Sequence, residues 1–289
     1  MYKMASLAGV FLAALVTLSS ALTDEQISVF MTTEMVETNT GLMGVISIET
    51  ADGMHTITSN GVPDHLTPEY PRMGNPNDIE TQSHLWTVPV NPSVADSNTA
   101  LPMGPIGVAI NGIPLFNPFT ITGEDAVLTE TFDSCDGHPD PMGVYHYHKQ
   151  PASCVFTIVD GEPSSIIGVA LDGFPIYGPI DENGNTLKSD DLDECHGRYV
   201  NGEYRYHTTA DFPYILGCFK GEYTASGGGP PGPPGGGGSL PPPETTDPIN
   251  GQKIVQDVRD GVAGDNVCLP TSAPNTAICV PNSSDSALF

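Results

Sequence analysis

The stretch Gly-Val-Ala-Ile-Asn-Gly-Ile-Pro-Leu-Phe-Asn-Pro at 107–118 recurs as Gly-Val-Ala-Leu-Asp-Gly-Phe-Pro-Ile-Tyr-Gly-Pro at 168–179. The central Asn-Gly of the first copy and Asp-Gly of the second are strong signals for tight turns, because glycine adopts a positive φ freely. Apolar residues flank both turns. Each copy therefore predicts a small β-hairpin.

Further elements follow each hairpin in the same order. An Asp-x-Cys-x-Gly turn occurs at 133–137 and 193–197, and a Tyr-x-Tyr-His segment follows each turn, ending at His148 and His207. The agreement in order and spacing predicts a tandem duplication of units of about sixty residues, at about 85–154 and 155–221. Units of this size bury little apolar surface alone, so we expect them to pack on each other about a pseudo-twofold axis.

Short β-branched runs bounded by Gly, Pro, Asn and Asp predict many short strands, and long helices are not expected. Residues 24–36 are the exception, because their apolar residues fit a helical face as well as a strand. We predict an all-β fold whose two repeats pack as a disulfide-stapled β-sandwich or barrel-like domain. This domain spans 85–225 and follows an N-terminal β region at 22–84.

The two ends of the chain have different compositions. Residues 1–21 have a lysine, an apolar run and small residues at the end, which predict a secretory signal peptide. No later segment is long and apolar enough to span a bilayer. Residues 226–243 are rich in Gly and Pro and form a predicted linker, and 244–289 form a short acidic tail. We expect an extracellular or cell-surface protein.

All six cysteines follow the predicted signal peptide, and an even count in a secreted chain indicates disulfides. Six cysteines allow fifteen pairings. Equivalence of the repeats favours Cys135–Cys154 and Cys195–Cys218, with Cys268–Cys279 as the third bond. A pairing exchanged between the repeats would also respect the symmetry.

The chain is strongly acidic, with nine Lys plus Arg against 35 Asp plus Glu and a formal net charge of −26. This balance argues against nucleic acid and anionic membranes as partners, because both attract basic surfaces. It is compatible with a bound cation, and also with a solvated acidic surface that binds nothing. An extracellular-matrix or cell-surface partner fits this composition, and the sequence does not determine the oligomeric state.

The segment Tyr145-His146-Tyr147-His148 is a candidate half of a metal site. Side chains alternate along a strand, so both histidines share one face and both tyrosines the other. We expect this strand to meet its repeat partner near the axis, which adds His207. Three imidazoles with an open fourth position suit zinc or copper. Arg205 stands where a fourth histidine would be; it leaves a three-histidine shell or turns outward to a carboxylate.

Other residues could support this site. His138 and His196 lie in the cysteine turns and are secondary ligand candidates. Four acidic residues could fix imidazole tautomers: Asp136, Asp140, Asp193 and Glu194. Calcium is a secondary cofactor candidate, because 181–185 resembles the start of a calcium loop, although a hairpin turn explains that segment equally well. The alternative to any metal is a Tyr-His ladder that only holds the repeats together.

The segments at 135–148, 168–179 and 204–219 together resemble the YHYH-domain family, over roughly 85–221. The resemblance implies a secreted or envelope protein and supplies no reaction. The second repeat of this family often looks like another Tyr-His-Tyr-His. Arg205 departs from that pattern and argues against a four-histidine site.

Three functions follow as hypotheses. The leading one is a non-enzymatic extracellular binding protein with copper or zinc at His146, His148 and His207. The second is a secreted metal-dependent hydrolase or oxidase that uses the open coordination position, which requires a pocket over the histidines and an acid or base nearby. The third is a structural cell-surface or matrix module, whose histidines would be buried, hydrogen-bonded and too far apart to share an ion.

Overall fold

Both predicted hairpins are present in the computed structural model, which describes residues 22–151, 154–223, 266–270 and 277–281. In the first, β5 (Pro105–Ala109) pairs with β6 (Pro114–Phe116). In the second, β9 (Ile166–Ala170) pairs with β10 (Pro175–Tyr177). Gly112 and Gly173 in the two turns have φ of +82° and +93°, a left-handed conformation that favours glycine.

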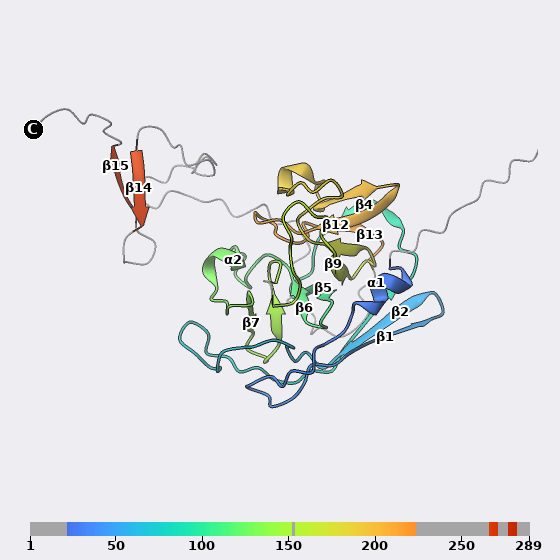
Figure 1. The fold of residues 1–289 in the computed structure, drawn as a ribbon, viewed down its shortest axis with the longest axis horizontal. Helices are drawn as coiled ribbons and strands as arrows, with labels where there is room; N and C mark the ends of the chain where they lie inside the picture. The colour runs from blue at the N-terminus through green and yellow to red at the C-terminus, as the bar shows by residue number, and fades with distance from the viewer. Residues whose placement is uncertain (1–21, 152–153, 224–265, 271–276, 282–289) are drawn as a thin grey trace, which may run out of the picture. The chain divides into compact units, whose positions relative to one another are not determined.

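The hairpins form the centre of an eight-stranded sheet, because β5 and β9 pair antiparallel with each other (Figure 1). The strand order is β7-β8-β6-β5-β9-β10-β12-β11, which is symmetric about the central pair. The outer strands are β7 (Gly137–Pro139), β8 (Tyr145–Tyr147), β11 (Gly197–Val200) and β12 (Glu203–His207). This order is the one expected of two similar units packed about an axis, although the duplication itself stays a prediction.

The sheet does not close into a barrel. Its order ends at β7 on one side and at β11 on the other, and each of these strands pairs with one neighbour within the described residues. The barrel-like alternative is therefore wrong, and the mostly β character is confirmed. Short edge strands of three and four residues leave little backbone unpaired, which limits edge-to-edge association.

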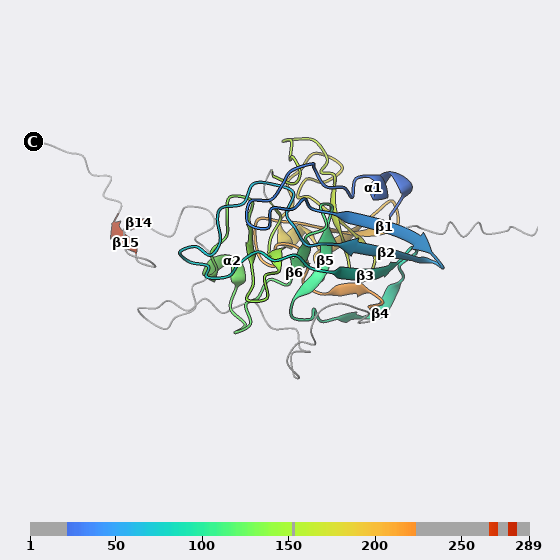
Figure 2. The same cartoon turned by 90° about the horizontal axis from the view of Figure 1, so that it is seen from below.

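A second, antiparallel sheet packs against the centre of the large one. It consists of β1 (Ile46–Ala51), β2 (Met54–Ser59) and β3 (His84–Pro89), which lie side by side in Figure 2. Ile57 and Trp86 of this sheet share a buried cluster with Val169 of β9. The second sheet thus covers one face of β5 and β9, and explains why both central strands are apolar on both faces.

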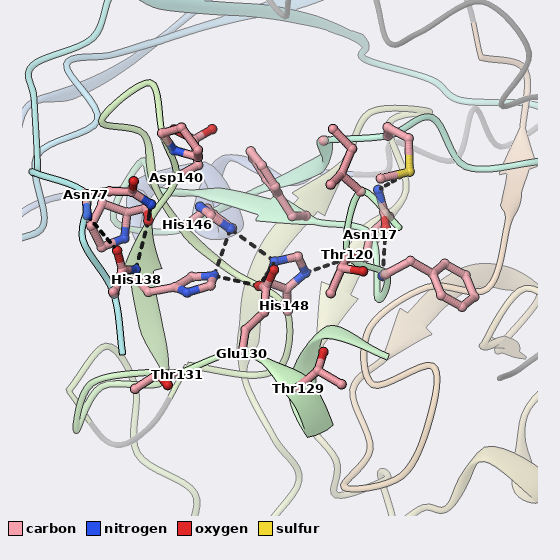
Figure 3. A pocket seen from close by; sticks show the side chains of 18 of the residues that line it. Asn77, Asn117, Thr120, Thr129, Glu130, Thr131, His138, Asp140, His146 and His148 are labelled. Atoms are coloured by element: carbon pink, nitrogen blue, oxygen red, sulfur yellow. Dashed lines mark hydrogen bonds and ion pairs between the residues drawn. The ribbon is translucent and has the colours of Figure 1, made fainter. Parts of the chain in front are cut away.

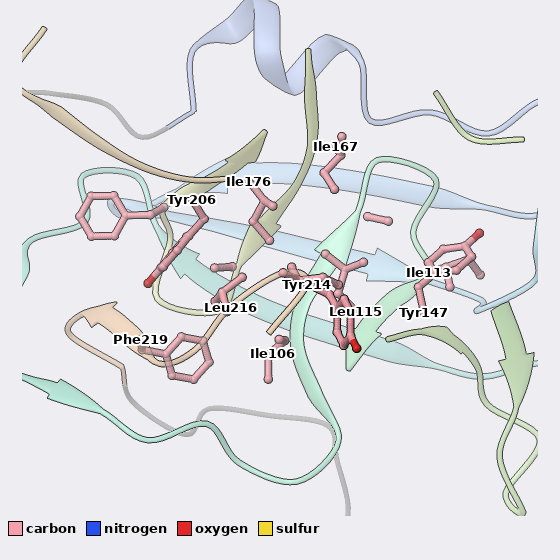
Figure 4. Packing of buried hydrophobic residues seen from close by; sticks show 14 of the residues in the cluster. Ile106, Ile113, Leu115, Tyr147, Ile167, Ile176, Tyr206, Tyr214, Leu216 and Phe219 are labelled. Carbon is pink, nitrogen blue, oxygen red and sulfur yellow. The ribbon is translucent and has the colours of Figure 1, made fainter. Parts of the chain in front are cut away.

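The main core lies on the other face of the large sheet. Ile106, Leu115, Ile176 and Leu216 are fully buried there, with Tyr206 and Phe219 at one end of the cluster and Ile113 and Tyr147 at the other (Figure 4). Leu216 and Phe219 belong to the segment after β12, which continues into β13 (Phe219–Gly221), the partner of β4 (Val94–Thr99). This cluster holds the two halves of the sheet together.

Helices are few and short in the described part of the chain: α1 (Asp24–Ser28), α2 (Ala126–Thr129) and the 3-10 helix η1 (Ser189–Asp191). Of the segment 24–36, only α1 is helical, and Thr23 caps it with a capping box. After the helix, Phe30 is buried whereas Met31 is 64% exposed. The continuous helical face considered for this segment does not form. None of the described helices is long and apolar enough to cross a membrane.

Two of the expected disulfides are confirmed: Cys135–Cys154 and Cys195–Cys218. The chain divides into two units, Met1–Pro242 and Pro243–Phe289. The second unit contains the hairpin of β14 (Asn266–Pro270) and β15 (Ala277–Pro281), whose backbone register pairs position 268 with 279. The side chains of that hairpin, the predicted signal peptide and the predicted linker lie outside the described part, so those expectations stay predictions.

Candidate metal centre

Strand β8 presents its residues as the alternation predicts. Tyr145 and Tyr147 are fully buried in the main core, and the Tyr145 hydroxyl donates a hydrogen bond of 2.7 Å to Asp133. His146 and His148 lie on the opposite face, with their Nε2 atoms 3.0 Å apart. The buried tyrosines therefore anchor the strand and set the direction of both imidazoles.

A third histidine comes from the neighbouring strand. The antiparallel register of β7 and β8 places His138 opposite His146, and their Nε2 atoms lie 3.1 Å apart. Each histidine of this triad (His138, His146 and His148) is at most 6% exposed, and one ring nitrogen from each lies within 4.8 Å of the others. Two nitrogens on a tetrahedral zinc ion lie about 3.3 Å apart, from a Zn–N bond of about 2.0–2.1 Å. The spacing of the triad is close to that value.

The other ring nitrogens determine which tautomers are present. His146 Nδ1 lies 2.9 Å from Val144 O, and His148 Nδ1 lies 2.6 Å from Asn117 O. A carbonyl oxygen only accepts hydrogen bonds, so each Nδ1 carries a proton, and in a neutral ring the Nε2 atom then carries a lone pair. Burial, above all other causes, lowers the pKa of His146 well below its usual value, which favours the neutral ring there. The short distance between the Nε2 atoms of His146 and His148 fits a proton or a metal cation between them.

A carboxylate completes the cluster. Glu130 is the residue directly after α2, and its Oε2 lies 3.2 Å from His138 Nε2 and 3.4 Å from His148 Nε2. This oxygen is buried and has no hydrogen bond. Burial raises the pKa of the Glu130 carboxyl, but hydrogen bonds from His138 and His148, and their positive charge when protonated, lower it well below its usual range, so the group is ionised. Three imidazoles and one carboxylate thus converge, as Figure 3 shows.

The sequence does not single out Glu130. It is one of 35 acidic residues and lies eight positions before His138, outside every motif. The helix α2 that precedes it is four residues long, and its N-cap Asp125 accepts a hydrogen bond of 2.9 Å from Val127 N. That capped turn, which no sequence period predicts, brings the carboxylate to the triad.

Aromatic rings hold the imidazoles in place. The Phe116 ring stacks on His146, with centroids 3.9 Å apart and an interplanar angle of 22°. The Phe132 ring lies 4.6 Å from His138. Packing of this kind, together with the Nδ1 hydrogen bonds to carbonyl groups, fixes ring orientation and keeps the Nε2 atoms preorganised for a ligand.

The cluster forms one wall of a pocket of about 560 Å³. Asn77, Asn117, Thr120 and Thr129 lie around the same space in Figure 3. The volume is within the range of small-molecule sites. A metal ion bound to the triad would therefore face open space on one side, where water or a ligand could reach it.

The structure does not bring His207 to the triad. In the sheet order, β12 is five strand spacings from β8, or about 24 Å along the sheet. His207 Nδ1 donates to Gly178 O at 2.8 Å, and its Nε2 accepts a hydrogen bond of 3.0 Å from Arg205. Burial lowers the pKa of His207 to about 4. The strands that meet at the centre are β5 and β9, because those strands are apolar on both faces.

Arg205 turns outward to a carboxylate, one of the two outcomes expected for it. Its guanidinium lies 3.2 Å from Glu182 and 4.4 Å from the centre of the Tyr177 ring. In the second half of the sheet, a guanidinium therefore satisfies the Nε2 lone pair of His207. In the first half, the corresponding Nε2 atom of His148 lies 3.0 Å from His146 Nε2 and 3.4 Å from Glu130 Oε2.

His196 belongs to a separate hydrogen-bond network. Its Nε2 lies 3.1 Å from Ser189 Oγ and 3.0 Å from Thr209 Oγ1, and its Nδ1 lies 2.9 Å from Ile215 O. The four acidic residues expected to orient imidazoles have other partners: Lys149 for Asp136, the backbone of Met142 and Val144 for Asp140, the Cys195 turn for Asp193 and Asn98 for Glu194.

The segment considered for calcium forms a turn. One Asp181 oxygen accepts backbone hydrogen bonds of 2.8 Å from both Asn183 and Asn185. Those hydrogen bonds lower the pKa of Asp181 to about 2. Because the other oxygen lies 3.6 Å from Arg198, the carboxylate already has partners without calcium.

These features define a mostly β, disulfide-bonded domain with a buried three-histidine cluster near one edge of its sheet. Residues 85–188 match the family model described as YHYH protein, which agrees with the resemblance that the motifs indicate. No curated protein and no solved structure was found to match the chain. The matched segment contains Glu130 and the triad, whereas His196 and His207 lie beyond it.

Proposed function

We propose that this chain is a secreted protein that binds one copper or zinc ion through His138, His146 and His148. The observation that carries the proposal is the convergence of three Nε2 atoms with a buried carboxylate oxygen that has no hydrogen bond. A proton can bridge only two of these atoms, whereas a divalent cation can attract all four. Neutral imidazoles suit both metals.

The extracellular setting has separate support. Two disulfides are typical of chains that fold in an oxidising compartment. The structural alternative expected His146, His148 and His207 to be buried, hydrogen-bonded and too far apart to share an ion, and His207 fits that description. The separations of 3.0 and 3.1 Å between Nε2 atoms of His138, His146 and His148 support metal binding by this different set.

Metal analysis of the protein, made in an oxidising compartment, stripped with a chelator and reconstituted, tests the proposal. We expect one equivalent of zinc or copper, and His148→Ala should weaken the affinity by about a hundredfold or more because one of three ligands is lost. His207→Ala is the matched control and should keep wild-type affinity. Sub-stoichiometric metal, or an unchanged affinity in His148→Ala, would refute the proposal.

A second candidate function, a metal-dependent hydrolase, is favoured by the pocket and by Glu130. Metal coordination lowers the pKa of a bound water to about 7, and a neighbouring carboxylate can accept its proton. An ester and amide substrate panel tests this function on the zinc-loaded protein. Glu130→Gln should lower turnover at least a hundredfold while zinc stays bound. Equal turnover in the wild type and in Glu130→Gln would contradict the hydrolase function and leave metal binding as the proposed function.

A further inference from the structure

The pocket in front of the triad is lined partly by apolar side chains, and none of its described lining residues carries a permanent positive charge. Phe116, Phe119, Met103 and Ile121 supply apolar surface, and the polar contributors are neutral amides and hydroxyls apart from two carboxylates. None of the described residues that line it is Lys or Arg. An anionic ligand would find no charge partner among these side chains.

The charge balance of the occupied site points the same way. A divalent metal ion contributes +2, and the lining carboxylates of Glu130 and Asp140 contribute −1 each, so the pocket is close to neutral with its metal. The chain as a whole carries a formal charge of −26. The electric field of this negative charge repels anions as they approach, and a neutral pocket offers no electrostatic attraction to offset that repulsion.

The pocket lining includes an exposed apolar side chain. Ile121 lines the pocket and is 83% exposed. Met73, Leu128 and Met142 are 95%, 68% and 59% exposed, and each is the neighbour in sequence of a lining residue. An exposed apolar side chain in the lining suits an apolar ligand.

We infer that this pocket binds an uncharged, largely apolar small molecule that coordinates the metal through a single nitrogen or oxygen atom. The inference rests on the proposed metal site. The triad supplies the coordinating centre, the phenylalanines contact the apolar body of the ligand, and the neutral amides and hydroxyls bind its remaining polar atoms. The lack of a cationic side chain among the described lining residues disfavours carboxylate or phosphate groups.

Cobalt-substituted protein provides the test, because visible absorption of cobalt reports both metal binding and ligand coordination. The probes are imidazole, 4-phenylimidazole and imidazole-4-acetate, titrated at about pH 8 so that the rings are neutral. We expect 4-phenylimidazole to bind about tenfold or more tighter than imidazole and imidazole-4-acetate to bind more weakly than imidazole.

Two variants locate the preference. Ile121→Ser should reduce the preference for the phenyl ring about threefold, and Leu42→Ser, an exposed apolar residue that does not line the pocket, should leave it unchanged. A cobalt spectrum with equal or tighter binding of imidazole-4-acetate overturns this inference alone. Absence of any cobalt spectrum overturns the metal site and the inference with it.

Discussion

His148 and His207 form a natural pair for testing the metal site by stability. Each ends a Tyr-x-Tyr-His segment, each is at most 4% exposed, and each donates its Nδ1–H to a backbone carbonyl at the end of a hairpin. In metal-free protein, alanine at either position removes a similar buried ring and its hydrogen bond to the backbone, and His207→Ala also removes the hydrogen bond from Arg205. We expect each variant to lose about 2–4 kcal/mol in free energy of unfolding.

Added metal should separate the two variants. Zinc at 100 times its dissociation constant adds about 2.7 kcal/mol of stability to a protein that binds it only when folded. In a domain of about 200 residues, 1 kcal/mol corresponds to about 2–4 °C in Tm. Zinc should therefore raise the Tm of the wild type and of His207→Ala by about 5–10 °C. His148→Ala should gain less than about 2 °C.

Thermal unfolding followed by circular dichroism, with and without zinc after chelation, measures these shifts. The comparison is internal to each variant, so a general loss of stability does not disturb it. Equal zinc shifts in the wild type and His148→Ala would refute the site. A shift lost in His207→Ala and kept in His148→Ala would instead make His207 a ligand, as the sequence suggested.

Three further predictions concern stability. Burial lowers the pKa of His84 to about 4, below the ordinary value of a histidine, so between about pH 6.5 and pH 4 the unfolded chain binds a proton at this residue that the folded chain does not. The contribution of His84 to the free energy of unfolding should therefore fall by about 1.4 kcal/mol per pH unit in this window, and a His84→Gln variant should show a shallower pH dependence in urea titrations. Fully buried Asp172 accepts hydrogen bonds from a tyrosine hydroxyl and two backbone N–H groups; Asp172→Ala should cost about 3 kcal/mol in urea unfolding, and a cost under about 1 kcal/mol would contradict this role. Replacing Cys135 and Cys154 by serine opens a disulfide with a sequence separation of 19, and should lower stability by about 3 kcal/mol in the same assay.

Local features of the fold are readable from the sequence. The Asn-Gly and Asp-Gly turns predict both hairpins, because only a few residue types adopt the backbone conformations of a two-residue turn. The alternation in Tyr145–His148 predicts which residues face the core. The two disulfides are the pairing that the equivalent positions of the cysteines favoured, although an exchanged pairing would have fitted the same positions. Each of these features depends on residues that are close together in the chain or that occupy equivalent positions in the two predicted repeats.

The ligand set depends on longer-range pairing. His138 meets His146 because β7 folds back antiparallel on β8, so its place at the centre of the site follows from strand register rather than from any motif. Glu130 reaches the site from the end of a short helix, through a loop with no sequence period. His138, a secondary ligand candidate in the sequence, thus becomes a central member of the site. Glu130, which belongs to no sequence motif, joins it.

His207 is a residue that the sequence assigned to the metal site and that the structure places elsewhere. The repeat in the sequence treats the two Tyr-His strands as equivalent, and equivalence suggested that they meet. Burial decided otherwise: the strands with apolar residues on both faces, β5 and β9, occupy the centre, and the Tyr-His strands lie toward opposite edges. The sequence by itself determined the hairpins, the strand faces and the resemblance to the YHYH family. Only the tertiary structure decided which histidines share a site, because strand order follows from non-local burial of apolar surface.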